Sequence, residues 1–164
     1  EKLERIVQAG RYTATGGNAQ ACRFIVVQEN LSALKKMIWK GIETTNEPPV
    51  TIPADALTRL KNFINLRTQG TDFLFRDAPV VIYVAAESAV DASLAAQTME
   101  LAAIAQGLGV LYNGFLVYAA NLNPAVHEWL DVQDKPLVVC MLVGYPRVTY
   151  QRTAPRRIAD VRWR

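Results

Sequence analysis

The sequence predicts helices that alternate with a few buried strands, in either an α/β or an α+β sandwich. Residues 77–86 (DAPVVIYVAA) and 136–143 (PLVVCMLV) are short continuous apolar runs rich in Val, which is typical of strands buried on both faces. Residues 92–105 are largely Ala, Leu, Met and Ile, with too few polar positions for a surface helix. A helix that is apolar nearly all round belongs inside a protein, so this segment is expected at the centre of the fold.

The first forty residues divide into helix, loop, strand and helix. Apolar residues at helical spacing predict a helix over residues 2–11. Tyr12–Gln20 (YTATGGNAQ) is small and polar with paired glycines, so it is expected to be a loop. Cys22–Gln28 (CRFIVVQ) is rich in β-branched and aromatic residues and predicts a strand. Asn30 is then expected to cap a helix that continues to about Ile42.

Further along, proline marks the loops and helix starts. Thr44–Pro53 (TTNEPPVTIP) is expected to be a loop broken by proline, and residues 54–68 form an amphipathic helix. Asn123–Trp129 predicts a short helix with Pro124 at its first position. Gly144-Tyr145-Pro146 is expected to turn the chain after the second buried strand.

The ends of the central helix are marked by polar and glycine residues. Asp91 is a suitable N-cap because its carboxylate can accept a backbone N–H of the first turn. Gly107 and Gly109 are expected to end the helix. The apolar run 110–114 (VLYNG) follows, and its backbone N–H groups could face a ligand. The alternative is a buried helix with an ordinary glycine stop.

Length and composition indicate one globular domain over residues 1–164, with 51% hydrophobic and 20% charged residues. The sequence has no apolar run of about 18 residues, so no transmembrane helix is expected. The chain opens on Glu1-Lys2-Leu3-Glu4-Arg5, without Met and unlike a signal peptide, so we expect a cytoplasmic protein that lacks a preceding segment. Cys22 and Cys140 lack metal-ligand spacing and are expected to be buried free thiols.

The net charge of +3 is unevenly distributed. Residues 145–164 carry six Arg and one Asp, which gives +5 and leaves 3 − 5 = −2 for the rest of the chain. A basic tail suggests an anionic partner such as nucleic acid, an acidic protein or a ligand phosphate, and the alternative is a solvated tail. The arginines alternate with Thr, Ala and Pro, which suits a fixed loop better than a flexible arm.

Several catalytic and nucleotide-binding devices are absent from the sequence. There is no GxGxxG after a strand and no Walker loop, so the usual nucleotide cradles are missing. His127 lies on an amphipathic helix, where a structural histidine is expected rather than part of a Ser-His-Asp triad. Three polar features remain: Thr15–Gln20, Asn113-Gly114 and Arg152. Amide groups and backbone N–H groups can bond the edge of a planar ligand, and Arg suits a phosphate.

Read together, these pieces resemble the FMN-dependent nitroreductase family. The matching motifs occur in the family's order and cover nearly the whole chain: residues 9–20 (AGRYTATGGNAQ), 23–27 (RFIVV), 77–80 (DAPV), 91–97 (DASLAAQ), 107–109 (GLG) and 144–146 (GYP) with Arg152. The C-terminus, with YQR at 150–152, PR at 155–156 and VRW at 161–163, is similar to a branch that is sometimes fused to a ferredoxin-like iron–sulfur module.

The resemblance implies an α+β fold, with a central, mainly antiparallel sheet flanked by helices. It also implies an intertwined homodimer with one FMN at each interface. The implied FMN contacts form three sets. A loop of Ala14, Thr15, Gly16, Asn18 and Gln20 would reach the flavin bound mainly by the other subunit. The backbone of Leu111, Tyr112, Asn113 and Gly114 would lie along the isoalloxazine near N5 and O4, and Arg152 would hold the phosphate.

The resemblance further implies a ping-pong reaction. NADH or NADPH reduces the flavin and leaves, and a nitro compound, quinone or similar small acceptor takes its place. The flavin supplies the chemistry, so neither a catalytic acid or base nor a metal is expected. The sequence does not choose between NADH, NADPH and a ferredoxin-type donor.

Two departures from the family pattern affect the expected site. Ala21-Cys22 stands where the family often has Pro-Trp, which changes the pocket wall, and the family's Arg-rich N-terminal segment would precede Glu1. Two other hypotheses remain. One is a non-catalytic relative that carries or senses flavin or another small molecule. The other, ranked last because no nucleic-acid motif accompanies the arginines, is a nucleic-acid-binding module.

Overall fold

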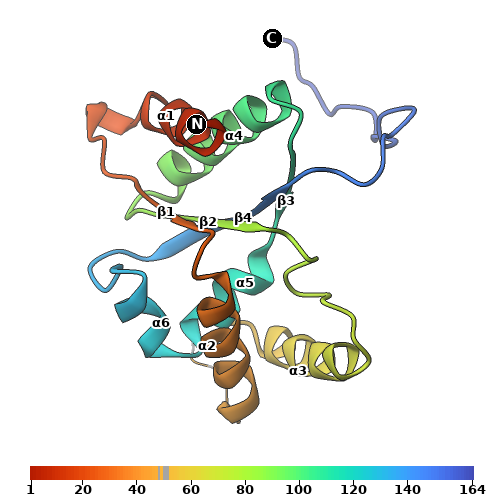
Figure 1. Cartoon of the computed structure of the whole chain (residues 1–164). Coiled ribbons are helices and arrows are strands. Elements are labelled where there is room, and N and C mark those ends of the chain that lie inside the picture. Colours follow the sequence, from red (N-terminus) through yellow and green to blue (C-terminus); the bar gives the residue numbers. More distant parts are fainter. Residues whose placement is uncertain (48, 50–51) are drawn as a thin grey trace.

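A four-stranded antiparallel sheet separates two layers of helices (Figure 1). The computed structural model describes residues 1–47, 49 and 52–164. The strands are β1 (Arg23–Val27), β2 (Val80–Ala85), β3 (Gly109–Tyr112) and β4 (Leu137–Gly144). Their order in the sheet is β1-β2-β4-β3, so β1 and β3 form its two edges. The predicted antiparallel α+β class is confirmed.

The helices are divided between the two faces of the sheet (Figure 1). One face carries α1 (Lys2–Arg11) and α4 (Ala89–Ala105). The other face carries α2 (Leu31–Thr44), α3 (Ala54–Thr68), α5 (Gly114–Asn121) and α6 (Pro124–Trp129). A short 3-10 turn, Gly16–Asn18, lies in the connection between α1 and β1.

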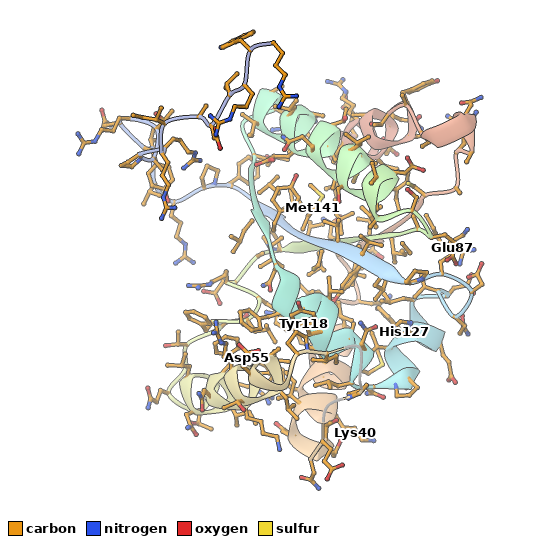
Figure 2. The ribbon with its side chains drawn as sticks, turned by 180° about the vertical axis from the view of Figure 1, so that it is seen from behind. Lys40, Asp55, Glu87, Tyr118, His127 and Met141 are labelled. Atoms are coloured by element: carbon orange, nitrogen blue, oxygen red, sulfur yellow. The ribbon has the colours of Figure 1, made fainter. Side chains whose placement is uncertain are left out.

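Each face of the sheet has its own hydrophobic core, because side chains alternate along a strand. Val81 and Tyr83 of β2 pack with α2, α5 and α6, whereas Ile82 and Met141 pack with α1 and α4. Figure 2 shows Met141 on the α4 side of the sheet and Tyr118 on the α5 side. Burial on both faces explains why β2 and β4 read as continuous apolar runs in the sequence.

Most of the predicted elements are confirmed. The helices over residues 2–11 and 54–68 match α1 and α3. The predicted strand Cys22–Gln28 contains β1, with one residue fewer at each end. Pro124 is the first residue of α6, and the side chain of Asn123 caps it by accepting the Ala125 N–H at 3.2 Å.

Two predictions for residues 30–53 need qualification. Asn30 occupies the N-cap position of α2, but its side chain forms no capping hydrogen bond. Helix α2 continues through Thr44, two residues beyond the predicted end, so the connecting loop begins at Thr45. Part of this predicted loop, Pro48, Val50 and Thr51, falls outside the described residues.

The predicted start of the central helix is wrong, and its predicted end is confirmed at Gly107 but not at Gly109. Helix α4 begins at Ala89, and its N-cap is Ser88, whose Oγ accepts the N–H of Asp91 at 3.2 Å. Asp91 therefore lies in the first turn, where its carboxylate is free to accept a donor from another segment. At the other end Gly107 takes the left-handed conformation, with φ of +75°, after the helix stops. Gly109 does not end the helix but begins β3.

The expectation that α4 is buried all round is also wrong for the single chain. Ala92, Ala96 and Met99 pack into the core beneath it. The opposite side of the helix exposes four large apolar side chains, by 49 to 68%: Val90, Leu94, Leu101 and Ile104. We call this set the α4 stripe. Its members recur at helical spacing, so they lie on one face of the helix.

Two elements were not predicted from the sequence. Strand β3 has four residues, and α5 follows it after a single residue, Asn113. The sequence analysis identified the 110–114 run as apolar but assigned it no strand. The register places Tyr112 opposite Met141 of β4.

The C-terminal residues 145–164 form no helix or strand and are exposed, and the segment extends away from the body (Figure 1). The hydroxyl of Tyr145 accepts a hydrogen bond from Lys2 at 3.3 Å, and further along Arg162 pairs with Asp160 in the segment itself. A single chain therefore does not show the fixed loop that the arginine spacing suggests. Within the described residues, no helix is both long enough and apolar enough to cross a membrane.

Candidate functional site

The loop between α1 and β1 has a constrained backbone. Gly17, Asn18 and Gln20 all have positive φ, of 58°, 54° and 50°, a conformation that is uncommon outside glycine. The hydroxyl of Thr15 accepts the N–H of Gln20 at 3.0 Å, and the Gln20 side chain donates to Asn18 Oδ1 at 3.1 Å. Strained backbone held by local hydrogen bonds is characteristic of ligand-binding loops.

Asp91 connects this loop to α4. Its Oδ1 accepts the N–H of Gly16 at 3.0 Å, and the residue is only 8% exposed. The sequence predicted Asp91 as an N-cap. Its carboxylate instead forms a long-range hydrogen bond that connects α4 to the loop 75 residues earlier in the chain. The first turn of α4 also favours a negative charge electrostatically.

We expect Asp91→Ala to release the loop without unfolding the protein. A hydrogen bond to a buried carboxylate contributes about 1.5–3 kcal/mol, and its loss should speed hydrogen exchange at the Gly16 amide by at least about tenfold. Asp91→Asn keeps an acceptor at this position and is the matched control. Equal exchange rates of the Gly16 amide in wild type and Asp91→Ala would show that the hydrogen bond from Gly16 to Asp91 does not stabilise the loop.

A hollow of about 260 Å³, the loop pocket, opens beside these residues. Its lining includes Thr15 and Gln20 together with Cys22 and Phe24. Cys22 is half-buried rather than fully buried as expected, while Cys140 is buried, and both are free thiols. Burial, assisted by the nearby Asp91 carboxylate, raises the pKa of the Cys22 thiol. Cys22 therefore contributes a neutral thiol to the lining of the loop pocket and is not a thiolate nucleophile.

The junction of β3 and α5 forms the second part of the site, and Asn113 fixes its shape. Its backbone N–H donates to the Cys140 carbonyl at 2.8 Å, and its side chain donates to the Leu74 carbonyl at 2.7 Å. Its Oδ1 caps α5 by accepting the Leu116 N–H at 3.1 Å. The N–H groups of Gly114 and Phe115 belong to the first turn of α5, so they have no partner within the helix.

A second hollow of about 390 Å³, the aromatic pocket, lies directly against this junction. Besides residues 111–114, its lining comprises Phe63, Phe73, Leu74, Arg76, Phe115 and Tyr118. The sequence analysis did not identify these six residues as site residues. Phe115 and Tyr118, three residues apart on α5, and the aromatic cluster at 73–75 were the available signals, but only the folded chain brings them to one place.

Tyr112 is hydrogen-bonded through its hydroxyl to Glu100 Oε2 of α4, at 3.1 Å. Burial and this hydrogen bond to a carboxylate raise the pKa of Tyr112 well above its ordinary value. The phenol therefore stays protonated at physiological pH and acts as a donor to Glu100. This bond fixes the end of β3 against α4.

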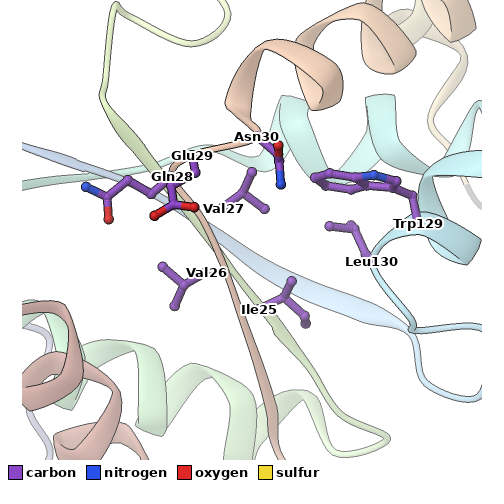
Figure 3. A pocket seen from close by; sticks show the side chains of 8 residues that line it. All are labelled: Ile25, Val26, Val27, Gln28, Glu29, Asn30, Trp129 and Leu130. Carbon is purple, nitrogen blue, oxygen red and sulfur yellow. The ribbon is translucent and has the colours of Figure 1, made fainter.

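A third hollow, of about 410 Å³, lies along the β1 edge of the sheet (Figure 3). Figure 3 shows Trp129 and Leu130 on one side of it and the strand residues Val26 and Val27 on the other. It contains none of the residues implicated by the sequence. His127, as expected, is structural, since its Nε2 lies 2.7 Å from Asn121 Oδ1. Within the described part of the chain, no cluster of three His, Cys, Asp or Glu side chains could hold a metal.

Comparison with known protein families settles the ancestry of this fold. The model of the "Nitroreductase family" matches residues 1–145, which is most of the chain.

This chain belongs to the nitroreductase family.

Solved structures share the nitroreductase fold over nearly the whole chain. A nitroreductase with bound FMN from Bacteroides fragilis is 19% identical, with a TM-score of 0.72, and the match covers 98% of this chain and 84% of that one. A nitroreductase with bound FMN from Desulfitobacterium hafniense is 20% identical, with a TM-score of 0.71, covering 98% and 86%. A Bacteroides thetaiotaomicron protein with the provisional name NADH dehydrogenase/NAD(P)H nitroreductase is 20% identical, with a TM-score of 0.64, covering 99% and 83%. No curated protein matched the chain.

In this member of the nitroreductase family the three sets of implicated residues do not meet within one chain. The 14–20 loop precedes β1, and residues 111–114 end β3, so the two sets lie at opposite edges of the sheet. Three strand spacings of about 4.8 Å separate those edges. Arg152 lies on the exposed tail, and within the described residues no hydrogen bond or ion pair joins it to either set.

Proposed function

We propose that this nitroreductase-family chain is an FMN-dependent oxidoreductase that uses NAD(P)H to reduce nitro compounds, quinones or similar small acceptors by a ping-pong mechanism. The observation that supports this most directly is the β3–α5 junction, where backbone donors without helical partners lie beside an aromatic pocket. Family membership and the FMN bound by two similarly folded nitroreductases support the choice of flavin. The name of the Bacteroides thetaiotaomicron protein supports NAD(P)H as donor.

The residues at the junction fit a planar ring. A Cβ added to Gly114 would meet nothing within 4 Å, so a flat ligand has room to approach the backbone there. The donors of Gly114 and Phe115 can face a carbonyl or nitrogen at the ring edge, where they would stabilise negative charge as an oxyanion hole does. Leu74 and Phe115 add apolar walls to the pocket.

We also propose that the site is completed by a second copy of the chain. Within one chain the 14–20 loop lies at the opposite edge of the sheet from β3, so it does not reach a flavin held at its own β3 edge. The 14–20 loop of the partner would contact that flavin instead. The α4 stripe supplies a face for such a homodimer, since four exposed apolar side chains at helical spacing are costly to leave in water. In this arrangement Thr15, Gly16, Asn18 and Gln20 would contact the ring that the partner's β3–α5 junction holds.

FMN, when bound, would supply the two-electron redox chemistry that links NAD(P)H to an oxidant. The protein residues would bind the flavin, orient it and polarise its ring. Asn113 fixes the direction of the α5 donors through its three hydrogen bonds. Tyr112 holds the end of β3 against Glu100. Arg152, which suits a phosphate, would hold the FMN phosphate once the tail lies against the dimer.

The test of this function is the visible spectrum of the protein reconstituted with FMN, followed by anaerobic addition of NADH or NADPH. We expect a bound flavin band that bleaches with at least one donor and returns when a quinone or nitro compound is added. A protein that takes up no FMN would contradict the proposal. Bound flavin that neither nucleotide reduces would instead support a flavin carrier.

The role of Arg152 can be tested separately through the phosphate. We expect Arg152→Gln to raise the Kd for FMN by about tenfold, because a charge-assisted Arg–phosphate contact is lost. The Kd for riboflavin, which has no phosphate, should not change. Arg157→Gln, in the same exposed tail, is the matched control. An equal loss of affinity for both flavins would rule out a phosphate contact.

A further inference from the structure

Half of the ten residues that line the aromatic pocket are aromatic. The Phe63 and Phe73 ring centroids are 4.8 Å apart, and those of Phe63 and Phe115 are 5.2 Å apart. Tyr118 continues the series, at 6.5 Å from Phe115. These rings, from α3, from α5 and from the segment before β2, therefore pack against one another and give the hollow an aromatic wall, which suits a planar aromatic ligand.

Arg76 is the one charged side chain among the described residues that line this pocket. Its guanidinium carbon lies 3.7 Å from the centroid of the Phe73 ring. A guanidinium stacked on a ring face keeps its in-plane N–H groups available for an acceptor. The positive charge is therefore presented at an aromatic surface, with its hydrogen-bonding edge open.

The backbone at Arg76 is held in an unusual conformation. Arg76 and Asp77 both have positive φ, of 55° and 53°, and the Arg76 N–H donates to the Asp72 carbonyl at 2.8 Å. Two consecutive non-glycine residues in this region are strained, and such strain persists where the surrounding structure fixes it. The turn directs Arg76 to the pocket immediately before β2 begins at Val80.

The acidic groups nearby have other partners. Asp72 pairs with Lys35 at 2.6 Å, Glu100 accepts the Tyr112 hydroxyl, and the Asp77 carboxylate lies 4.0 Å from Arg147. Among the described residues, the ion pairs do not include Arg76. The charge of Arg76 is therefore available to a ligand.

We propose that the aromatic pocket selects electron acceptors that carry a carboxylate on a planar aromatic ring, and that Arg76 binds this carboxylate. The inference rests on the proposed function and specifies its substrate class. The ring would pack in the pocket against the aromatic wall formed by Phe63, Phe73 and Phe115, while the carboxylate meets the open edge of the guanidinium. For a nitrobenzoate, two electrons and two protons convert the nitro group to a nitroso group and one water, NAD(P)H becomes NAD(P)⁺, and the carboxylate is unchanged.

The test compares 4-nitrobenzoate with the neutral 4-nitrobenzyl alcohol on the FMN-loaded protein. We expect Arg76→Gln to raise KM for the carboxylate by about tenfold, with little change in kcat or in KM for the alcohol, because only the charged contact is lost. Arg76→Lys should restore part of the difference, since it keeps the charge without the planar fork. Arg59→Gln on the exposed side of α3 removes an arginine outside the pocket and is the matched control.

A binding measurement separates recognition from turnover. Benzoate, which the reaction cannot reduce, should bind the wild-type holoprotein in calorimetry and lose about tenfold in affinity with Arg76→Gln. Unchanged KM ratios and benzoate affinities, in a protein whose flavin NAD(P)H still bleaches, would overturn this inference and leave the proposed function intact. A protein that takes up no FMN would overturn both.

Discussion

A glutamate in place of Leu101 is expected to convert the protein from dimers to monomers and to abolish FMN binding. Leu101 is 60% exposed in the single chain, on the same face of α4 as Leu94 and Ile104. If this stripe is the dimer interface, a two-fold axis places the new carboxylate in the interface twice. Each buried, unpaired charge costs several kcal/mol, so the dissociation constant of the dimer should rise by at least about a thousandfold.

The measurement is the molar mass by light scattering over a range of protein concentrations, together with the FMN content of each fraction. Thr58→Glu, which adds the same charge at an exposed position of α3, should leave both unchanged. The two halves of the proposed site, the 14–20 loop and the β3–α5 junction, lie on opposite edges of the sheet, so loss of the dimer should also cause loss of FMN. A Leu101→Glu protein that remained dimeric and retained its flavin would show that the interface lies elsewhere.

The largest loss of stability is expected from Phe75→Ala. Phe75 is fully buried in the core on the α2 side of the sheet, and Lys35 Nζ lies 5.0 Å from its ring centroid. Removing a buried Phe side chain costs about 3–5 kcal/mol, because the lost burial adds to the cavity that remains. That is a large fraction of the stability of a typical domain, about 5–15 kcal/mol.

Urea denaturation at one fixed protein concentration would measure the effect as a shift in the unfolding midpoint. Phe75→Leu refills much of the space and should cost less than half as much. Ligand binding in the aromatic pocket should also weaken, because the pocket residues Phe73, Leu74 and Arg76 flank Phe75 in sequence. A midpoint equal to that of wild type in Phe75→Ala would contradict this account of the core.

The sequence was most informative where one local pattern decides the structure. Strands β2 and β4 were predicted because both of their faces are buried, and α3 because its amphipathic spacing continues over fifteen residues. Strand β3 was missed because four residues are too few to show the alternation of apolar and polar residues that marks a strand. The interior placement of α4 was wrong because an apolar face that a partner would cover looks, in sequence, like one that the chain itself buries.

The candidate site divides in the same way. The loop with Gly17 and Asn18 was recognisable from its glycines, and Asn113-Gly114 from its place after an apolar run. Arg76 was not recognisable, because its importance depends on Phe63, Phe73 and Phe115 meeting in space. The role of Asp91 was misassigned for a related reason. An Asp near a helix start predicts a local cap, whereas here its acceptor serves a loop 75 residues earlier in the chain.

The placement of the two half-sites at opposite edges has a genetic consequence if the dimer forms as proposed. A chain damaged in its 14–20 loop still has an intact β3–α5 junction, and a chain damaged at Gly114 still has an intact loop. In a mixed dimer of these two chains, one interface joins both lesions and the other joins both undamaged parts. Random pairing would then leave roughly a quarter of all sites whole. Two alleles that are each inactive alone could therefore support each other in one cell.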